Sequence, residues 1–337
     1  KGEVGVSERK GREGLPELKN VDRKKGVVTR FAPSPSGPLH AGHILSAMPS
    51  SLYVKKYGGK FYVRIEDTNP ENIYEKAYKM IKDECEWLFD NVEEYIIQSD
   101  RLKIYYKYAK KLIDFGFGYV CDCDNEKFKE MIEKQKECPC RKLNRKDNLL
   151  RWKKMLDAKG YEEEEAALRF RGNIKDSNPA FRDFPLARIN LAEHPRQKKK
   201  FRVWPLMNLA VAVDDIEFKT THAIRGKDHR DNSVRQKMIY SVLKKKFPES
   251  LFIGRINFDD FELSTTKTRK AIESGEYSGW DDSRLPFVAS LKKRGYKKEA
   301  FELMALQRGI SEVDKVISQK DFYELLNRYN DAVGKKK

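Results

Sequence analysis

Two histidines beside a turn rich in proline and glycine are the residues of this sequence best placed to do chemistry. Residues 33–43 read PSPSGPLHAGH, after a strand-like segment and at the start of a helix-like one. A helix N-terminus binds phosphate through free backbone N–H groups, and His40 and His43 could donate hydrogen bonds to a transferring phosphoryl group. Gly42 would let a flat base lie against the backbone. No Gly-Lys-Ser/Thr follows, which excludes a Walker loop, and a stiff turn with surface histidines is the alternative.

Four of the five cysteines form two close pairs on either side of a helical stretch at residues 125–135. The pairs are Cys121 with Cys123 and Cys138 with Cys140. Two thiolate pairs in this order can bind zinc through four sulfur ligands. The spacing within each pair is tighter than usual, so free thiols at strand ends stay open as an alternative. Cys85 lies on the apolar face of a periodic helix and is expected in the core.

The charge of the chain favours a polyanionic partner. Lys and Arg total 69 against 52 Asp and Glu, a formal net charge of +17 over 337 residues. Binding to nucleic acid releases counterions from neutralised phosphates, although a Lys-rich proteome is the plain alternative. No run of about 18 apolar residues predicts a membrane span, and no signal peptide opens the chain. With an odd number of cysteines, this predicts a cytoplasmic protein without a membrane partner. Because residue 1 is Lys rather than Met, we expect a fragment of a longer chain.

Alternating strands and helices must position the histidine turn. We expect strands at 27–31, 60–66 and 95–98 and helices at 41–57, 71–89 and 101–115, with a kink at Pro49. This alternation predicts a parallel sheet with right-handed crossovers. It stops near Gly118 and resumes after Phe201, with strands near 220–225 and 251–256 around a helix at 231–245. Beyond residue 260 we expect no further strands, and residues 268–330 look helical.

Several motifs resemble one enzyme family when they are taken together. They are RFAPSPSG at 30–37, HAGH at 40–43, RIEDTNP at 64–70, DD at 214–215, IRGKDH at 224–229 and YSGWDDSRLP at 277–286. In this order, over about residues 15–330, they resemble class I glutamyl-tRNA synthetases. The last block and LSTTK at 263–267 resemble the archaeal branch of that family.

The resemblance implies an α/β fold and a division of the chain. A charged arm at 1–26 would precede a Rossmann-like catalytic domain made of 27–118 and 201–258. A zinc-containing insertion at 119–200 would split this domain and bind the acceptor end of tRNA. The signature loop and a helical region that contacts the tRNA stem would occupy 259–337. Ligands should lie at the carboxyl ends of the parallel strands. An anticodon-binding domain is expected to be absent.

The resemblance also implies an ATP site. The residues it assigns to ATP are Gly42, Asp228, His229, Leu263 and Ser264, with His40 and His43 as catalytic groups. Ala41 stands where the family usually has isoleucine. In the mobile lysine loop Glu262 replaces the usual first lysine and Thr265 the second, so Lys267 is the catalytic candidate. The alternative is that Lys267 only contacts tRNA.

A glutamate pocket follows from the same resemblance. Its residues would be Arg30, Ala32, Ser34, Glu66, Met207 and Arg225. Arginine binds carboxylates through two parallel hydrogen bonds, and an acidic group such as Glu66 suits the substrate ammonium. The glutaminyl enzymes generally lack an arginine at the position of Arg225, which makes it the best indicator of glutamate. Without this context, Arg64 and Glu66 would pass for a surface ion pair.

The sequence therefore predicts a ligase that activates L-glutamate with ATP and Mg²⁺ and transfers it to the 3′ end of tRNA(Glu). Zn²⁺ is the expected structural metal, and a monomer is the expected state. Two alternatives stay open. One is a glutamyl-queuosine tRNA(Asp)-type synthetase, which naturally lacks an anticodon domain. The other is a non-catalytic tRNA-binding paralogue, suggested by the altered lysine loop.

Overall fold

A computed structural model describes residues 14–335 of the chain, so half of the predicted arm at 1–26 lies outside the described residues. The strands are β1 (Val27–Phe31), β2 (Gly59–Ile65), β3 (Val92–Ile97), β4 (Gly118–Cys121), β5 (Ala167–Phe170), β6 (Phe184–Ile189), β7 (Val203–Pro205), β8 (His222–Gly226), β9 (Glu249–Ile253), β10 (Ile256–Phe258) and β11 (Lys315–Ile317). The helices are α1 (Ala41–Tyr57), α2 (Ala77–Leu88), α3 (Leu102–Asp114), α4 (Asn125–Glu133), α5 (Arg145–Leu156), α6 (Met207–Glu217), α7 (Arg230–Val242), α8 (Thr265–Glu273), α9 (Val288–Lys293), α10 (Lys298–Arg308) and α11 (Gln319–Gly334).

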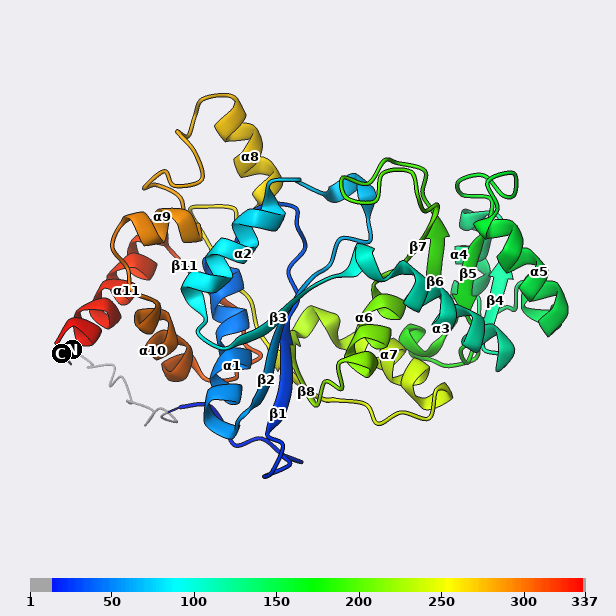
Figure 1. The fold of residues 1–337 in the computed structure, drawn as a ribbon, viewed down its shortest axis with the longest axis horizontal. Helices are drawn as coiled ribbons and strands as arrows, with labels where there is room; N and C mark the ends of the chain where they lie inside the picture. Colours follow the sequence, from blue (N-terminus) through cyan, green and yellow to red (C-terminus); the bar gives the residue numbers. More distant parts are fainter. Residues whose placement is uncertain (1–13, 336–337) are drawn as a thin grey trace, which may run out of the picture.

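A parallel sheet forms the centre of the molecule (Figure 1). Strands β1, β2 and β3 pair in parallel in that order, and β8 pairs in parallel with β9. The two groups meet where β8 lies beside β1, and the Thr221 N–H donates to the Val28 carbonyl at 2.9 Å. Four of the five residues of β1 are buried, as expected for a strand that is covered on both faces. The α/β prediction is confirmed, and the predicted strand 27–31 and helix 41–57 match β1 and α1 to the residue.

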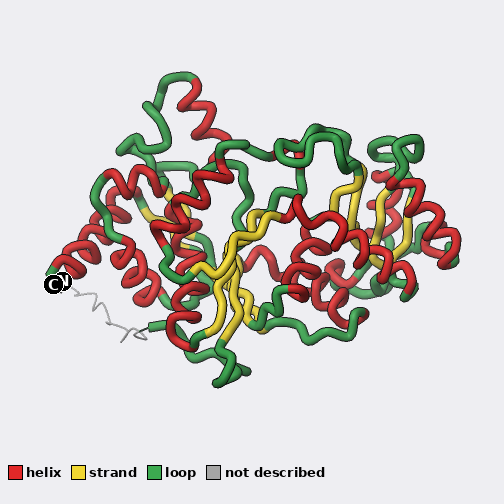
Figure 2. The backbone as a smooth tube through the Cα atoms, in the orientation of Figure 1, coloured by secondary structure: helices red, strands yellow, loops and turns green. Residues whose placement is uncertain are grey.

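The segment between the two halves of this sheet builds an antiparallel sheet of its own. Strands β4, β5, β6 and β7 pair in chain order, from Gly118 to Pro205, with α4 and α5 beside them (Figure 2). This range runs slightly beyond the predicted insertion at 119–200. Leu168 and Leu186 from this sheet share a core with Tyr105 of α3 and Leu209 of α6. The segment is therefore packed firmly against the two helices that flank it in sequence.

Three sequence expectations need correction. A strand does follow residue 260, because β11 pairs in parallel with β10. The helix expected from residue 71 begins at Ala77, since Tyr74 N–H donates to the Pro35 carbonyl at 2.8 Å and holds the preceding residues against the histidine turn. The strand expected at 251–256 is interrupted at Gly254, whose N–H donates to the Ser311 carbonyl at 2.8 Å.

The described part of the N-terminal arm is packed rather than free. Leu15, Leu18 and Val21 lie against the core that contains α1. The Leu18 N–H donates to the Tyr57 hydroxyl at 3.1 Å, and the Tyr53 hydroxyl donates to the Pro16 carbonyl at 3.0 Å. Within residues 14–335, no helix combines the length and apolar character needed to cross a bilayer.

Candidate active site

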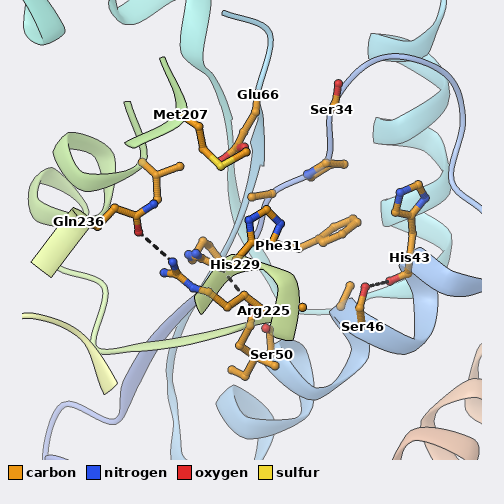
Figure 3. A pocket seen from close by; sticks show the side chains of 17 residues that line it. Phe31, Ser34, His43, Ser46, Ser50, Glu66, Met207, Arg225, His229 and Gln236 are labelled. Atoms are coloured by element: carbon orange, nitrogen blue, oxygen red, sulfur yellow. Dashed lines mark hydrogen bonds between the residues drawn. The ribbon is translucent and has the colours of Figure 1, made fainter. Parts of the chain in front are cut away.

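A cavity of about 270 Å³ opens at the carboxyl ends of β1, β2 and β8 (Figure 3). Open parallel sheets bind ligands at this edge because the loops there are free to diverge. Eight of the predicted site residues line the cavity: Arg30, Ala32, Ser34, His43, Glu66, Met207, Arg225 and His229. The fold therefore brings residues nearly 200 positions apart to one cavity.

Three buried arginines surround a single carboxylate beneath this cavity. Arg64 Nη1 donates to Asp215 Oδ1 at 2.6 Å, and Arg30 Nε donates to the same oxygen at 3.2 Å. Arg225 Nη2 lies 3.9 Å from Asp215 Oδ2. Burial alone would raise the pKa of Asp215, but the three guanidinium groups lower it to about 2. Asp215 therefore stays ionised and fixes the positions of the arginines.

Much of the hydrogen-bonding capacity of the Arg225 guanidinium group is not used by the described residues. Its Nη1 donates to Gln236 Oε1 at 2.8 Å and to Ser233 Oγ at 3.1 Å, but its buried Nε and Nη2 have no hydrogen-bond partner among the described residues. Burial and then the charge of Arg30 lower the pKa of Arg225 to about 10, so the group is still cationic at neutral pH. Buried donors without partners are rare and costly, so this edge of the cavity is built for an anion.

Glu66 supplies the opposite charge at the same cavity. It accepts from Arg64 Nη2 at 3.0 Å through Oε1 and is only partly buried, while Arg64 is 2% exposed. An exposed surface pair, the alternative drawn from sequence alone, is therefore wrong for Arg64. A carboxylate beside unpaired guanidinium donors suits a ligand that carries both an ammonium and carboxylates.

The two histidines stack on each other at the start of α1. Their ring centroids lie 3.7 Å apart, and the backbone N–H of His40 donates to His43 Nδ1 at 3.3 Å. Burial lowers the pKa of His43 to about 4, and burial followed by the neighbouring ring lowers the pKa of His40 well below its usual value. Both rings are neutral at pH 7, so they act as hydrogen-bonding groups rather than as cations. His43 lines the cavity, whereas His40 is not among its lining residues.

Backbone groups at the start of α1 already form hydrogen bonds with a distant segment of the chain. The Ala41 N–H donates to the Pro286 carbonyl at 2.9 Å, and the Val288 N–H donates to the Leu39 carbonyl at 2.9 Å. The amides of His43 and Ile44 both donate to the His40 carbonyl. Fewer amides are thus available for phosphate than a free helix end would offer. A Cβ on Gly42 would lie 3.1 Å from the His40 ring, so this glycine makes room for that histidine.

The signature loop rests against the histidine turn. Ser36 Oγ and Thr265 Oγ1 are 3.2 Å apart, and Leu263 lies close enough to Gly42 to touch a Cβ built there at 3.6 Å. Ser264 accepts from the Lys267 N–H and caps α8. Lys267 itself is exposed, and its ammonium pairs with Glu262 at 2.5 Å. The loop therefore lies against the histidine turn, and Lys267 is not among the residues that line the cavity.

Six predicted residues do not line the cavity: His40, Gly42, Asp228, Leu263, Ser264 and Lys267. Asp228 accepts instead from Arg255 Nη2 at 2.8 Å. Sequence reasoning assigned no role to Asp215, Ser233 or Gln236, which hold the cavity's arginines. A signal for Asp215 was present, since two adjacent acids inside the apolar stretch MNLAVAVDDI are expected to be buried and therefore paired.

The four paired cysteines converge at the far end of the antiparallel sheet. Cys121 and Cys138 have their Sγ atoms 3.7 Å apart, Cys123 and Cys140 have theirs 3.6 Å apart, and all four Sγ atoms lie within 4.8 Å of one another. Four sulfurs around one zinc at about 2.3 Å would lie about 3.8 Å from each other. The donor set and spacing therefore fit a tetrahedral thiolate site. Cys85 is buried in the catalytic core, as predicted.

The fold and cavity define an enzyme-like α/β domain with a charged ligand site at its strand ends. The family model for class I tRNA synthetases (E and Q), catalytic domain, matches residues 26–329. The chain belongs to this family.

Curated relatives agree with this family. The glutamate–tRNA ligase of Methanocaldococcus jannaschii is 44% identical over 324 residues, which is 96% of this chain and 58% of that protein. The enzyme of the same name from Methanobrevibacter smithii is 42% identical over 98% of this chain and 59% of its own length. This chain thus spans less than two thirds of these relatives. The crystal structure of a glutamate tRNA ligase from Elizabethkingia meningosepticum, at 19% identity, has a TM-score of 0.62 over 92% of this chain and 70% of that one, which shows a shared fold.

Proposed function

We propose that this chain is the catalytic portion of a glutamate–tRNA ligase of the archaeal type. It would activate L-glutamate with ATP and transfer it to the 3′ end of tRNA(Glu). The observation that carries the proposal is a cavity lined by both Glu66 and Arg225, whose buried guanidinium group has donors without partners among the described residues. The names of the archaeal relatives support the same activity.

Charge balance favours glutamate as the amino acid. The guanidinium groups of Arg30, Arg64 and Arg225, together with that of Arg101, which pairs with Asp214, face three carboxylates, those of Asp214, Asp215 and Glu66. A ligand with one net negative charge would balance the cluster. Glutamate has that charge, whereas glutamine is neutral overall. In this proposal Arg225 and Arg30 bind carboxylate, Glu66 binds the ammonium, and Ala32, Ser34 and Met207 form the walls.

ATP would bind along the histidine turn, next to the amino acid. A carboxylate oxygen of glutamate attacks the α-phosphorus, the bond to pyrophosphate breaks, and glutamyl-adenylate and pyrophosphate result. Neutral His40 and His43 donate hydrogen bonds to the phosphate chain as its charge shifts toward the leaving group. Gly42, His229, Asp228, Leu263 and Ser264 would contact the nucleotide, and Lys267 would reach the leaving pyrophosphate. Mg²⁺ that accompanies ATP neutralises phosphate charge.

The acceptor end of tRNA would lie on the segment at 119–200, and its stem on residues 259–337. The net charge of +17 supports this, because phosphate contacts dominate nucleic-acid affinity. The four-cysteine cluster would hold one Zn²⁺ as a structural ion that ties β4 to the residues after α4. A monomer in the cytoplasm completes the proposal.

The proposal is tested by ATP–pyrophosphate exchange with the purified chain, with and without tRNA. Glutamate-dependent exchange together with glutamylation of tRNA(Glu) is expected. Transfer to queuosine-containing tRNA(Asp) alone would favour the queuosine-type enzyme. Tight tRNA binding without any exchange, with glutamate at millimolar concentration, would favour a non-catalytic paralogue.

A further inference from the structure

Among the described residues, only neutral groups form hydrogen bonds with the guanidinium group of Arg225. Gln236 and Ser233, both on α7, accept from its Nη1 at 2.8 and 3.1 Å, and Figure 3 shows the contact with Gln236. Gln236 is 2% exposed, so this contact is buried. The other two arginines of the cluster are bound differently, since Arg30 and Arg64 each contact a carboxylate within 3.2 Å.

The orientation of the Gln236 amide is set by a chain of side chains with a single direction. Gln236 Nε2 donates to Asn208 Oδ1 at 3.3 Å, and Asn208 Nδ2 donates to Asn232 Oδ1 at 3.3 Å. The last link joins Asn232 Nδ2 and His229 Nδ1 at 3.1 Å. Because each side-chain amide donates a hydrogen bond from its NH₂ group to the next residue, the Gln236 carbonyl oxygen must face Arg225. The chain connects α6 and α7 and consists entirely of side chains without a negative charge.

This arrangement fixes the orientation of the Arg225 side chain without neutralising its charge. The carboxylate nearest to it is that of Asp215 at 3.9 Å, which is already engaged more closely by Arg30 and Arg64. A carboxylate in place of the Gln236 amide would lie about as close to the guanidinium as the amide oxygen does. It would form a charge-assisted pair and remove the unpaired charge from the cavity.

We propose that Gln236 is a specificity-determining positioning residue, whose uncharged carbonyl aims Arg225 at the ligand while leaving its charge to select an anionic side chain. The inference rests on the proposed function, because it takes glutamate as the amino acid. An amide at position 236 favours glutamate over glutamine. An acid there removes this preference, since glutamine can still offer a carbonyl acceptor to the paired arginine.

The test compares Gln236→Glu, Gln236→Met and Gln307→Glu in pyrophosphate exchange with saturating tRNA. Gln307 is exposed on α10, so its variant controls for the added charge. The values of kcat and KM are measured for glutamate, glutamine and ATP. For Gln236→Glu we expect the ratio of kcat/KM for glutamate to that for glutamine to fall at least about tenfold, a change of about 1.4 kcal/mol. The KM for ATP should stay within about twofold. Gln236→Met should raise the KM for glutamate severalfold but keep the preference for glutamate over glutamine. Arg225 would lose the hydrogen bond that orients it, but it would keep its charge.

Two results would overturn the inference in a wild-type protein that activates glutamate. One is an unchanged preference in a Gln236→Glu protein whose melting temperature shows it to be folded. The other, which holds even when that variant does not fold, is a wild-type KM for glutamate in Gln236→Met. Absence of glutamate-dependent exchange in the wild-type protein is a separate outcome and would overturn the proposed function itself.

Discussion

Glu84 on α2 accepts a hydrogen bond of 2.7 Å from the backbone N–H of Leu39, the residue before His40. The carboxyl group is 8% exposed and has no cation beside it in the described residues, so burial raises its pKa from 4.5 to about 8. At neutral pH this side chain is therefore largely a neutral acid that anchors the histidine turn.

The first prediction concerns stability against pH. Between pH 4.5 and 8 the folded protein holds a proton on Glu84 that the unfolded chain has lost, so this group's contribution to stability falls as pH rises through that window. Glu84→Gln keeps the acceptor and removes the titration. It should raise the free energy of unfolding at pH 8.5 by roughly 2–4 kcal/mol relative to wild type and change little near pH 5. Thermal unfolding at both pH values measures this, with the exposed Glu86→Gln as the control. Equal shifts at the two pH values would contradict it.

The second prediction concerns Arg225. Arg225→Ala leaves the ligand carboxylate in a buried site without its cation, which costs about 2–5 kcal/mol. Steady-state kinetics should show a raised KM for glutamate and a nearly unchanged KM for ATP. Lys237→Ala, which removes an exposed cation on the neighbouring helix α7, should leave both constants unchanged. Equal losses for both substrates would remove Arg225 from the amino-acid pocket.

Lys267 gives the third prediction. If it stabilises the leaving pyrophosphate, Lys267→Ala should lower kcat for exchange about 10²–10³-fold while tRNA affinity falls little. Lys270→Ala on the same helix should affect only tRNA affinity and its dependence on salt. Because Lys267 is paired with Glu262 on the surface, Glu262→Gln should change kcat less than about fivefold. A Lys267→Ala enzyme with full kcat would assign the residue to tRNA binding, and Arg269→Ala would then test whether the role has moved along α8.

The fourth prediction concerns metal content. The purified protein should contain about one zinc per chain by elemental analysis, because the four sulfurs already lie within 4.8 Å of one another. Cys121→Ser or Cys140→Ser should lower this content and loosen the segment around α4, as seen in limited proteolysis. Cys85→Ala should keep the metal, since Cys85 packs in the other core. A metal-free wild-type protein prepared without chelators would show that the cluster is a set of free thiols.

Much of the catalytic sheet could be predicted from the sequence because its signals are local. The strand-like segment VVTRF at 27–31 and the helical stretch at 41–57 predicted β1 and α1 correctly. The short strand β11 could not be found this way. Lys315 and Val316 are exposed, so three residues carry no alternation of apolar and polar side chains that would mark a half-buried strand.

Motifs in the sequence predicted several residues of the charged site, but not which of these residues contact one another. Motifs identified Arg30, Glu66 and Arg225, but which side chain neutralises which depends on contacts between residues up to 185 positions apart. Gln236 has no local signal at all, since a glutamine within a polar helical stretch looks like a solvent-facing residue. Only the packing of α7 against β8 and α6 turns it inward.

The pairing of residues 39–41 with 286–288 also bears on how the chain folds. Val288, Leu291, Phe301 and Phe322 of the C-terminal helices belong to the same apolar core as Val27 and Ile44 of the catalytic sheet. In the proposed function the boundary near residue 259 would separate two tasks, but the shared core means that the parts on either side of it are not expected to unfold independently. Removing the C-terminal helices would expose the interior of the catalytic sheet to water. The catalytic sheet and the C-terminal helices should therefore unfold in a single cooperative transition, and loss of α11 should destabilise the histidine turn.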